Sequence, residues 1–369
     1  MKKVLLPLFL LILAIACGQD TYTIKGSIEN PEALPEDAKV YVSDRTDPQL
    51  PVIDSAVIEN GSFTLKGKAD PEKMYNIYVG YPDHSIGDPR WATSFIPEKG
   101  SYDIILRERL STVSGGKINE ALNEFKESIQ EITDDFRKKV ADFGDDEEEK
   151  AQALYDETME KMNELSRQTI KKNANNYISL IALQNIIYDI DLEDLENILD
   201  HCGSFVKEND RIKRIHDCKV AEEATSEGKA FVDFSGKTPE GADVKLSDFV
   251  GKGKWVLADF WASWCGPCMR EIPNIKKTHE TLSGDKFTVL GIAVWETNGD
   301  NTKSADRMKE KEMTWPQIFV GDDKTPTDVY GIVGIPTMIL FAPDGTICKR
   351  GEDLRGEKMM ETVRDIINQ

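Results

Sequence analysis

Two cysteines separated by two residues, Cys265 and Cys268, have the type and spacing that point most directly to chemistry. The apolar, aromatic residues 255–261 before them predict a buried strand, and the residues after them favour a helix. The pair would then lie where a strand leads into a helix, whose free amides and dipole stabilise a thiolate. We therefore expect Cys265 to act as a nucleophile and Cys268 to be close enough to form a disulfide with it.

A pair of this spacing also supplies half of a tetrahedral zinc site. Zinc requires two further ligands, and the sequence contains no second Cys-x-x-Cys pair. The sequence therefore favours a redox pair over a metal site, and we expect neither a metal nor another cofactor.

Three further cysteines lie away from this pair and from the N-terminus. Cys202 and Cys218 fall in an acidic region expected to be helical, with His201 and His216 close by. A structural disulfide between these cysteines is the preferred interpretation, and free buried thiols or a Cys/His metal site are the alternatives. Cys348 follows a turn in an expected strand, which favours a buried small side chain over a third redox partner.

Two carboxylates have positions from which they could act on the pair. Asp259 is a single carboxylate in the apolar strand. Burial raises a carboxyl pKa, so Asp259 could accept the Cys268 proton near neutral pH; a partly solvated place at the strand end is the alternative. Glu271 follows Cys268 on the same helical face, and a solvated surface position is its alternative.

Two segments carry a resemblance to a known family. Residues 259–268, Asp-Phe-Trp-Ala-Ser-Trp-Cys-Gly-Pro-Cys, resemble thioredoxin, and Glu271-Ile-Pro273 is similar to the membrane-tethered TlpA/ResA branch of thiol-disulfide oxidoreductases. The second mark is Gly334-Ile-Pro-Thr337, followed by an apolar strand. In the family this proline is cis and faces the cysteine pair, and X-Pro bonds are the permitted site for a cis peptide. The resemblance is strong over residues 229–369.

The resemblance implies roles for the residues around the pair. The N-terminal cysteine, Cys265, would attack a substrate disulfide, and Cys268 would resolve the mixed disulfide. Trp264, Gly266 and Pro267 would contact the substrate. They would keep the surroundings of Cys265 open on one side and rigid on the other.

Further roles follow from the same resemblance. Asp259 would take the Cys268 proton and Glu271 would tune the cysteines, while Ile335 and Pro336 would contact the substrate. The backbone beside Pro336 could pair with an extended segment, and the apolar Ile335 suggests broad recognition. Thioredoxin pairs its aspartate with a lysine on the next strand, whereas residues 290–296 here contain none.

The N-terminus predicts export to the cell envelope. A positive Met-Lys-Lys start is followed by an apolar stretch, residues 4–16, that is too short to span a bilayer as a mature helix. Residues 13–18 resemble a bacterial lipobox, in which Cys17 is acylated; an ordinary signal peptide with a chance cysteine is the alternative. Acyl chains on Cys17 would anchor the protein in a membrane, facing the oxidising periplasm.

The whole chain divides into four parts. We expect a signal peptide at 1–16, a β-rich domain at 17–110 with a hairpin at Asn60-Gly61, a helical region and linker at 111–228, and a thioredoxin-like catalytic α/β domain at 229–369. Apolar residues spaced by three and four from 118 to 143, and again from 151 to 165, predict a helical hairpin. The β-rich part resembles a domain that precedes thioredoxin-like modules in lipoproteins of Bacteroidetes-type bacteria.

The expected function is thiol-disulfide exchange on envelope proteins. The net charge of −20 over 369 residues argues against nucleic acid as a partner. The Gly-Pro pair between the cysteines matches thioredoxin, a reducing member of the fold, so a reductant supplied by a membrane electron donor is favoured, with apocytochrome c or misoxidised proteins as candidate substrates. A lipid-anchored binding or scaffold protein and a peroxidase are the alternatives.

Overall fold

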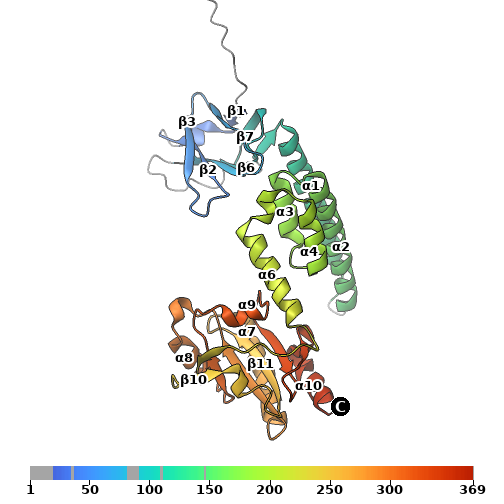
Figure 1. Ribbon diagram of the computed structural model, residues 1–369. Coiled ribbons are helices and arrows are strands. Elements are labelled where there is room, and N and C mark those ends of the chain that lie inside the picture. The colour runs from blue at the N-terminus through green and yellow to red at the C-terminus, as the bar shows by residue number, and fades with distance from the viewer. Residues whose placement is uncertain (1–19, 35–36, 81–90, 109–110, 145–146, 369) are drawn as a thin grey trace, which may run out of the picture. The chain divides into compact units, whose positions relative to one another are not determined.

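The computed structural model describes residues 20–34, 37–80, 91–108, 111–144 and 147–368, which form two compact units (Figure 1). The first unit holds residues up to 189 together with 197–207, and the second holds residues 190–196 and those from 208 onward. The expected signal peptide and Cys17 lie outside the described residues.

Two four-stranded sheets form the β-rich part of the first unit. Their strand orders are β4-β1-β7-β8 and β3-β2-β5-β6. The bounds are β1 (Thr21–Ile28), β2 (Lys39–Asp44), β3 (Val52–Val57), β4 (Ser62–Lys68), β5 (Tyr75–Gly80), β6 (Ala92–Phe95), β7 (Gly100–Leu106) and β8 (Thr112–Ser114). Apolar residues of both sheets, such as Ile24 and Val40, pack into one core. A tight turn lies at Asn60-Gly61 as expected, with φ angles of 51° and 71° that suit a type I′ turn, and Glu59 bridges Ser62 across it. The expected hairpin is wrong beyond this turn, because β3 and β4 pair into different sheets.

Helices follow the sheets, as the apolar spacing predicts. They are α1 (Lys117–Val140), α2 (Glu148–Lys172), α3 (Tyr177–Ile186), α4 (Leu192–His201) and α5 (Ser204–Lys207). The rings of Phe136 and Tyr155 lie 6.3 Å apart, so α1 and α2 form the predicted hairpin. The Glu98 carboxylate accepts hydrogen bonds from the amides of Ile118 and Asn119 at 2.9 and 2.8 Å, which caps α1 and fixes it to the sheets.

A seven-stranded mixed sheet is the centre of the second unit. Its order is β10-β9-β13-β12-β11-β14-β15, in which β11 runs parallel to β12 and antiparallel to β14. The strands are β9 (Ser235–Lys237), β10 (Asp243–Lys245), β11 (Trp255–Trp261), β12 (Phe287–Ala293), β13 (Gln317–Phe319), β14 (Thr337–Phe341) and β15 (Ile347–Arg350). This sheet, with helices between its strands, is the thioredoxin-like α/β fold that the two motifs predict.

Helices cover both faces of this sheet. They are α7 (Gly266–Leu282), α8 (Thr302–Glu310), α9 (Thr325–Val329) and α10 (Met359–Ile367). Helix α6 (Asp210–Ala224) precedes the sheet and contacts α9. Residues of α7 and α10 pack with Leu257 and Trp261 of β11, and Val256, Ala258 and Phe260 pack in a second cluster on the opposite face. The alternation of β11 side chains therefore decides which face each residue of this strand reaches.

Residues 228–231 extend along residues 345–347, and the hairpin of β9 and β10 begins at Ser235. One expectation about the cysteines is wrong. Cys202 and Cys218 form no disulfide: both thiols are free and buried, and they belong to different compact units. Burial raises the pKa of both thiols, which keeps them protonated and unreactive.

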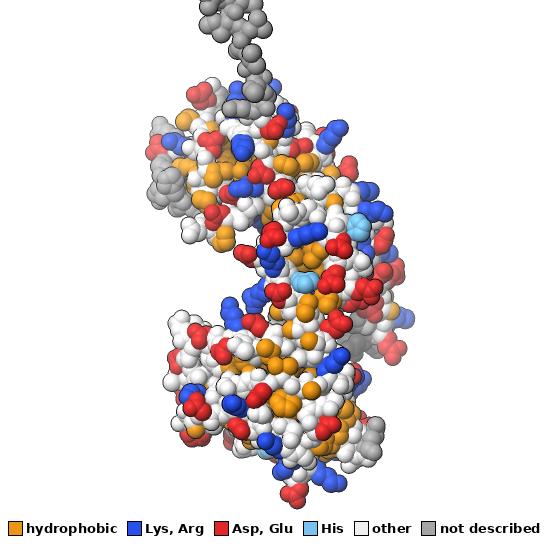
Figure 2. Space-filling view, in the orientation of Figure 1, with side chains coloured by type: hydrophobic (Ala, Val, Ile, Leu, Met, Phe, Trp, Pro, Cys, Tyr) orange, Lys and Arg blue, Asp and Glu red, His pale blue; other side chains and the backbone are white. Residues whose placement is uncertain are grey.

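Two properties of the described residues bear on location and partners. None of the helices in the described ranges has the length and hydropathy needed to cross a membrane. On the face shown in Figure 2, acidic and basic side chains are interspersed rather than separated into patches of one sign.

Candidate active site

Cys265 and Cys268 lie at the point where β11 leads into α7. They form a disulfide, and both side chains are nearly buried, with exposures of 3% and 2%. Cys265 is the N-cap residue of α7, and its Sγ accepts a hydrogen bond of 3.1 Å from the Cys268 amide. A free amide and the positive end of a helix dipole both favour a negative sulfur at Cys265, so this cysteine is the one whose thiolate the fold stabilises.

The loop that ends at Pro336 faces the pair. The Ile335–Pro336 peptide bond is cis, as the resemblance implies, and the Ile335 carbonyl oxygen lies 3.7 Å from the Sγ of Cys265. Ile335 is half-buried and Pro336 is buried, and Val333 in the same loop is 52% exposed. The structure thus brings the two sequence marks together at one surface.

The residues on either side of Cys265 in the chain are exposed. Trp264 is 57% exposed, and its indole nitrogen donates a hydrogen bond of 3.0 Å to the Trp295 carbonyl, which fixes the ring. Gly266 and Pro267 are exposed at the first turn of α7. An approaching polypeptide would therefore meet a fixed aromatic ring and a short stretch of bare backbone.

Asp259 lies beneath the cysteine pair, in the middle of β11. Its side chain is on the same face of the strand as Leu257 and Trp261, which pack with Cys268, and it is only 2% exposed. Burial, with a smaller contribution from the negative charge of Glu271, raises the pKa of Asp259 to about 8. Its Oδ1 has no hydrogen-bond partner within the described part of the chain. A buried carboxyl of this kind can hold or accept a proton near neutral pH.

Glu271 is buried on α7, so the solvated surface position that the sequence left open is wrong. It is 9% exposed, and its Oε1 accepts hydrogen bonds from the Gly356 amide at 2.7 Å and from the Asn274 side chain at 3.1 Å. Its charge raises the pKa of Asp259, while the charge of Arg355 lowers it. Glu271 and Arg355 therefore act on the same buried carboxyl with opposite sign.

Arg355 and Gln317 are two neighbours of this site that the sequence did not reveal. Gly291 of β12 is opposite Asp259, and a Cβ there would lie 1.9 Å from the Oε1 of Gln317. The Gln317 side chain fills that space and accepts a hydrogen bond of 3.1 Å from the Trp261 indole. The neutral Gln317 amide thus lies beside Gly291 of β12, the strand in which thioredoxin has a lysine. The positive charge near Asp259 comes from Arg355 instead.

A third unpredicted residue, Glu296, holds the loop before Cys265. It is 1% exposed and accepts hydrogen bonds from the Ser263 amide at 2.6 Å, the Ser263 hydroxyl at 2.8 Å and the Ser304 hydroxyl at 2.7 Å. These bonds satisfy a buried charge and fix the backbone two residues before Cys265. The sequence offered one signal for Glu296: it is a single carboxylate after an apolar strand.

None of the described residues forms a group of histidine, cysteine and carboxylate side chains suited to a metal ion. The site consists of a disulfide, a buried carboxyl and an apolar rim. The cysteine pair can exchange two electrons between its disulfide and dithiol forms, and the buried carboxyl can hold or release one proton.

The sequence matches two known families. Residues 228–350 match the AhpC/TSA family, and residues 22–122 match a domain of unknown function, DUF4369. Among bacterial relatives, the thioredoxin-like protein YneN of Bacillus subtilis is 31% identical over 140 residues, which covers 38% of this chain and 79% of that protein. Thiol-disulfide oxidoreductase ResA of the same organism is 28% identical over 150 residues, or 40% of this chain and 79% of that protein.

Solved structures give similar matches. The thioredoxin domain of a thiol-disulfide oxidoreductase from Bacteroides vulgatus is 30% identical and covers 39% of this chain and 99% of that chain, with a TM-score of 0.35. A thiol:disulfide interchange protein from Bacteroides sp. is 31% identical and covers 40% of this chain and 93% of that chain, with a TM-score of 0.35.

Proposed function

Because this chain belongs to the thioredoxin-like proteins and is a thiol-disulfide oxidoreductase, we propose that it reduces disulfides of cell-envelope proteins through Cys265 and Cys268. The observation that carries the proposal is the hydrogen bond of 3.1 Å from the Cys268 amide to the Cys265 sulfur at the start of α7. This hydrogen bond favours the thiolate form of Cys265, the cysteine that faces residues 331–336, the cis-proline loop.

The reaction begins from the reduced pair. The Cys265 thiolate attacks one sulfur of a substrate disulfide, which forms a Cys265–substrate mixed disulfide and releases the other substrate sulfur as a thiolate. Cys268 then loses its proton and attacks the Cys265 sulfur. The second substrate thiol leaves, so the substrate gains two electrons and the Cys265–Cys268 disulfide forms.

Asp259 is the proton acceptor for the second step in this proposal. It is buried on the face of β11 that packs against Cys268, and its raised pKa lets it exchange a proton near neutral pH. Glu271 and Arg355 set that pKa from opposite directions. A general acid or base of this kind typically contributes a factor of about 10² to 10⁴ to a proton-transfer step.

Substrate would bind along the cis-proline loop and the rim of the pair. The Ile335 carbonyl and its neighbouring backbone offer pairing to an extended segment, while Trp264, Gly266 and Pro267 supply apolar contact. Ile335 carries no polar side-chain group, which supports recognition of shape and backbone rather than of one sequence. Protein disulfides or dithiols, including apocytochrome c cysteines and misoxidised envelope proteins, are suitable substrates.

The cellular setting belongs to the same proposal. Cys17 would be acylated and become the first residue of the mature protein. Residues 17–110, 111–228 and 229–369 would then form a lipid-anchored β-domain, helical region and catalytic domain facing the periplasm. An envelope reductant needs a membrane electron donor, because the compartment is oxidising. A binding or scaffold role for the two N-terminal parts is the second interpretation.

A peroxidase is the alternative that the AhpC/TSA match favours. Such an enzyme would need a peroxidatic cysteine in a Thr-x-x-Cys setting, and Ala262 stands at the threonine position here. The two activities separate in one experiment. With dithiothreitol as the electron source, the full chain should reduce insulin and consume hydrogen peroxide no faster than a Cys265→Ser variant; rapid peroxide consumption without insulin reduction would support the peroxidase instead.

A further inference from the structure

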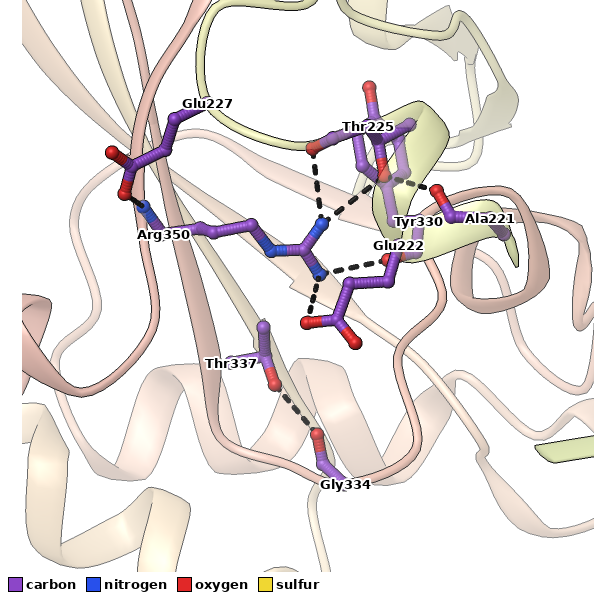
Figure 3. A network of polar contacts seen from close by, with 8 residues as sticks. All are labelled: Ala221, Glu222, Thr225, Glu227, Tyr330, Gly334, Thr337 and Arg350. Atoms are coloured by element: carbon purple, nitrogen blue, oxygen red, sulfur yellow. Dashed lines mark hydrogen bonds and ion pairs between the residues drawn. The ribbon is translucent and has the colours of Figure 1, made fainter. Parts of the chain in front are cut away.

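Arg350, the last residue of β15, is the centre of a polar network near the active-site loop (Figure 3). Its side chain is only 13% exposed. The guanidinium donates hydrogen bonds to the Thr225 carbonyl at 3.1 Å, the Thr225 hydroxyl at 3.2 Å and the Tyr330 carbonyl at 2.9 Å. The Glu222 carboxylate, 3.8 Å away, supplies the opposite charge. Three acceptors and one anion thus hold a buried cation in a fixed orientation.

Residues 225–228, which the sequence presents as a linker, are part of this network. Thr225 is fully buried, and its hydroxyl also donates to the Ala221 carbonyl at 2.7 Å. The Glu227 carboxylate accepts a hydrogen bond of 3.3 Å from the Arg350 amide. The C-terminal end of α6 is therefore attached to β15, although α6 precedes the segment that matches the AhpC/TSA family.

The same helix lies directly against Gly331. A Cβ on Gly331 would lie 2.2 Å from the Cys218 carbonyl oxygen and 2.6 Å from the Glu222 amide nitrogen, and its φ is 61°. Only a glycine fits that backbone contact without displacement. Helix α6 thus touches the residue that follows Tyr330 and opens the segment leading to Ile335.

Arg350 contacts the chain on both sides of the cis-proline loop, residues 331–336. On one side its guanidinium holds the Tyr330 carbonyl. On the other side its backbone pairs with Ile339 of β14, the strand that begins immediately after Pro336. Tyr330 is fixed from below as well, since its hydroxyl donates a hydrogen bond of 2.8 Å to the Val232 carbonyl.

We propose that Arg350 is a positioning residue that, together with the α6 contact at Gly331, sets the place of the cis-proline loop opposite Cys265. It touches neither substrate nor sulfur. It acts through Tyr330 and Gly331 on Ile335, whose carbonyl lies 3.7 Å from the Cys265 sulfur. Small displacements of groups that align a substrate have large effects on rate, so the loss of this clamp should weaken use of polypeptide substrates. The inference rests on the proposed exchange activity and adds a determinant of substrate alignment to it.

Steady-state kinetics with two substrates test the inference. In the full chain, Arg350→Met should raise the KM for insulin roughly tenfold, while the rate with cystamine, a small disulfide without a peptide backbone, changes less than about twofold. Arg350→Lys, which keeps the charge but reaches fewer acceptors, should lie between Met and wild type. Lys286→Met removes an exposed positive charge from the same domain, outside the Arg350 network, and should match wild type with both substrates.

Other results would overturn the inference. An unchanged KM for insulin alongside a lowered melting temperature would make Arg350 a purely structural residue. An equal loss with insulin and cystamine would show that it acts through the cysteine pair and not through the loop. If Arg350→Met does not fold, Thr225→Val and Arg350→Lys carry the same test, with the same two readouts. Failure of wild type itself to reduce insulin would instead contradict the proposed function.

Discussion

The Sγ of Cys265 lies 3.7 Å from the carbonyl oxygen of Ile335, a residue 70 positions further along the chain. This contact joins the helix start that stabilises a thiolate to the loop that can pair with a polypeptide. A substrate disulfide held along the loop would have one sulfur next to the nucleophile. The chemistry of each residue around this contact can be tested separately.

The order of the two cysteines is the first prediction. Removing the resolving thiol leaves the mixed disulfide without an attacking group, so a Cys268→Ser variant should accumulate a covalent complex with its substrate through Cys265. Mass spectrometry of the trapped species after proteolysis would identify the linked cysteine. Cys348→Ser serves as a control that should trap nothing. Trapping through Cys268 in a Cys265→Ser variant would reverse the assigned roles.

The pH dependence of resolution is the second prediction. The Asp259 carboxylate must be ionised to accept the Cys268 proton, and its pKa is about 8. The rate of resolution should therefore rise as the pH increases through about 8, and Asp259→Asn should lower that rate by roughly ten- to a hundredfold and remove the inflection. Stopped-flow measurement of decay of the mixed disulfide gives this profile directly.

Glu271 provides the companion test of that profile. Its negative charge raises the pKa of Asp259, so Glu271→Gln should move the inflection to lower pH. Glu280→Gln removes an exposed charge from the same helix and should leave the inflection in place. An inflection that stays fixed in the Glu271 variant would assign it to a group other than Asp259.

The free energy of unfolding should depend on pH through the ionisation of Asp259. The pKa of this carboxyl in the folded protein, about 8, lies above the ordinary aspartate value of 3.8, so the fold favours the protonated form. This contribution is fully present below about pH 4 and is lost as the pH rises toward about 8. Relative to wild type, the oxidised Asp259→Asn variant should become progressively more stable in urea between these limits. Parallel curves for the two proteins would show that Asp259 ionises normally.

The Glu296 network gives a prediction about the loop before Cys265. Replacing this buried carboxylate with alanine leaves the Ser263 amide and two hydroxyls without their acceptor, so Glu296→Ala should lower the free energy of unfolding by about 3 kcal/mol and slow exchange. Urea unfolding with an insulin assay measures both effects. Glu280→Ala removes an exposed carboxylate of α7 that has no contact with Ser263 and should change neither.

Local patterns were sufficient to predict the elements that carry the reaction. Cys265, Cys268 and Asp259 lie in one strand-to-helix segment, so their types and spacing predict their proposed chemistry. The cis bond at Pro336 and its place opposite the pair were expected from the family resemblance. The sheet of the catalytic domain follows from the same alternation of strands and helices. The tight turn at Asn60-Gly61 also follows from the φ angles that these residues tolerate, whereas the pairing of its two flanking strands into different sheets does not.

The supporting residues could not be predicted because distant segments supply them. Arg355, Gln317 and Glu296 reach the site through tertiary contacts that have no spacing rule in the chain. Arg350 and Gly331 could not be predicted for the same reason. In the sequence Arg350 is a cation at the end of a strand and Gly331 is a turn glycine, and only the position of α6 shows what they contact. The disulfide between Cys202 and Cys218 was predicted from compartment and composition, which carry no information on distance.

The reduction potential of the Cys265/Cys268 pair tests the central claim most directly. It can be measured by equilibrating the protein with dithiothreitol or glutathione buffers and counting thiols, with Cys202, Cys218 and Cys348 replaced by serine. A reductant of this fold should have a potential near the value of thioredoxin, about −270 mV. A potential near about −120 mV, the value of a strong oxidant, would contradict the claim and make the protein a disulfide donor.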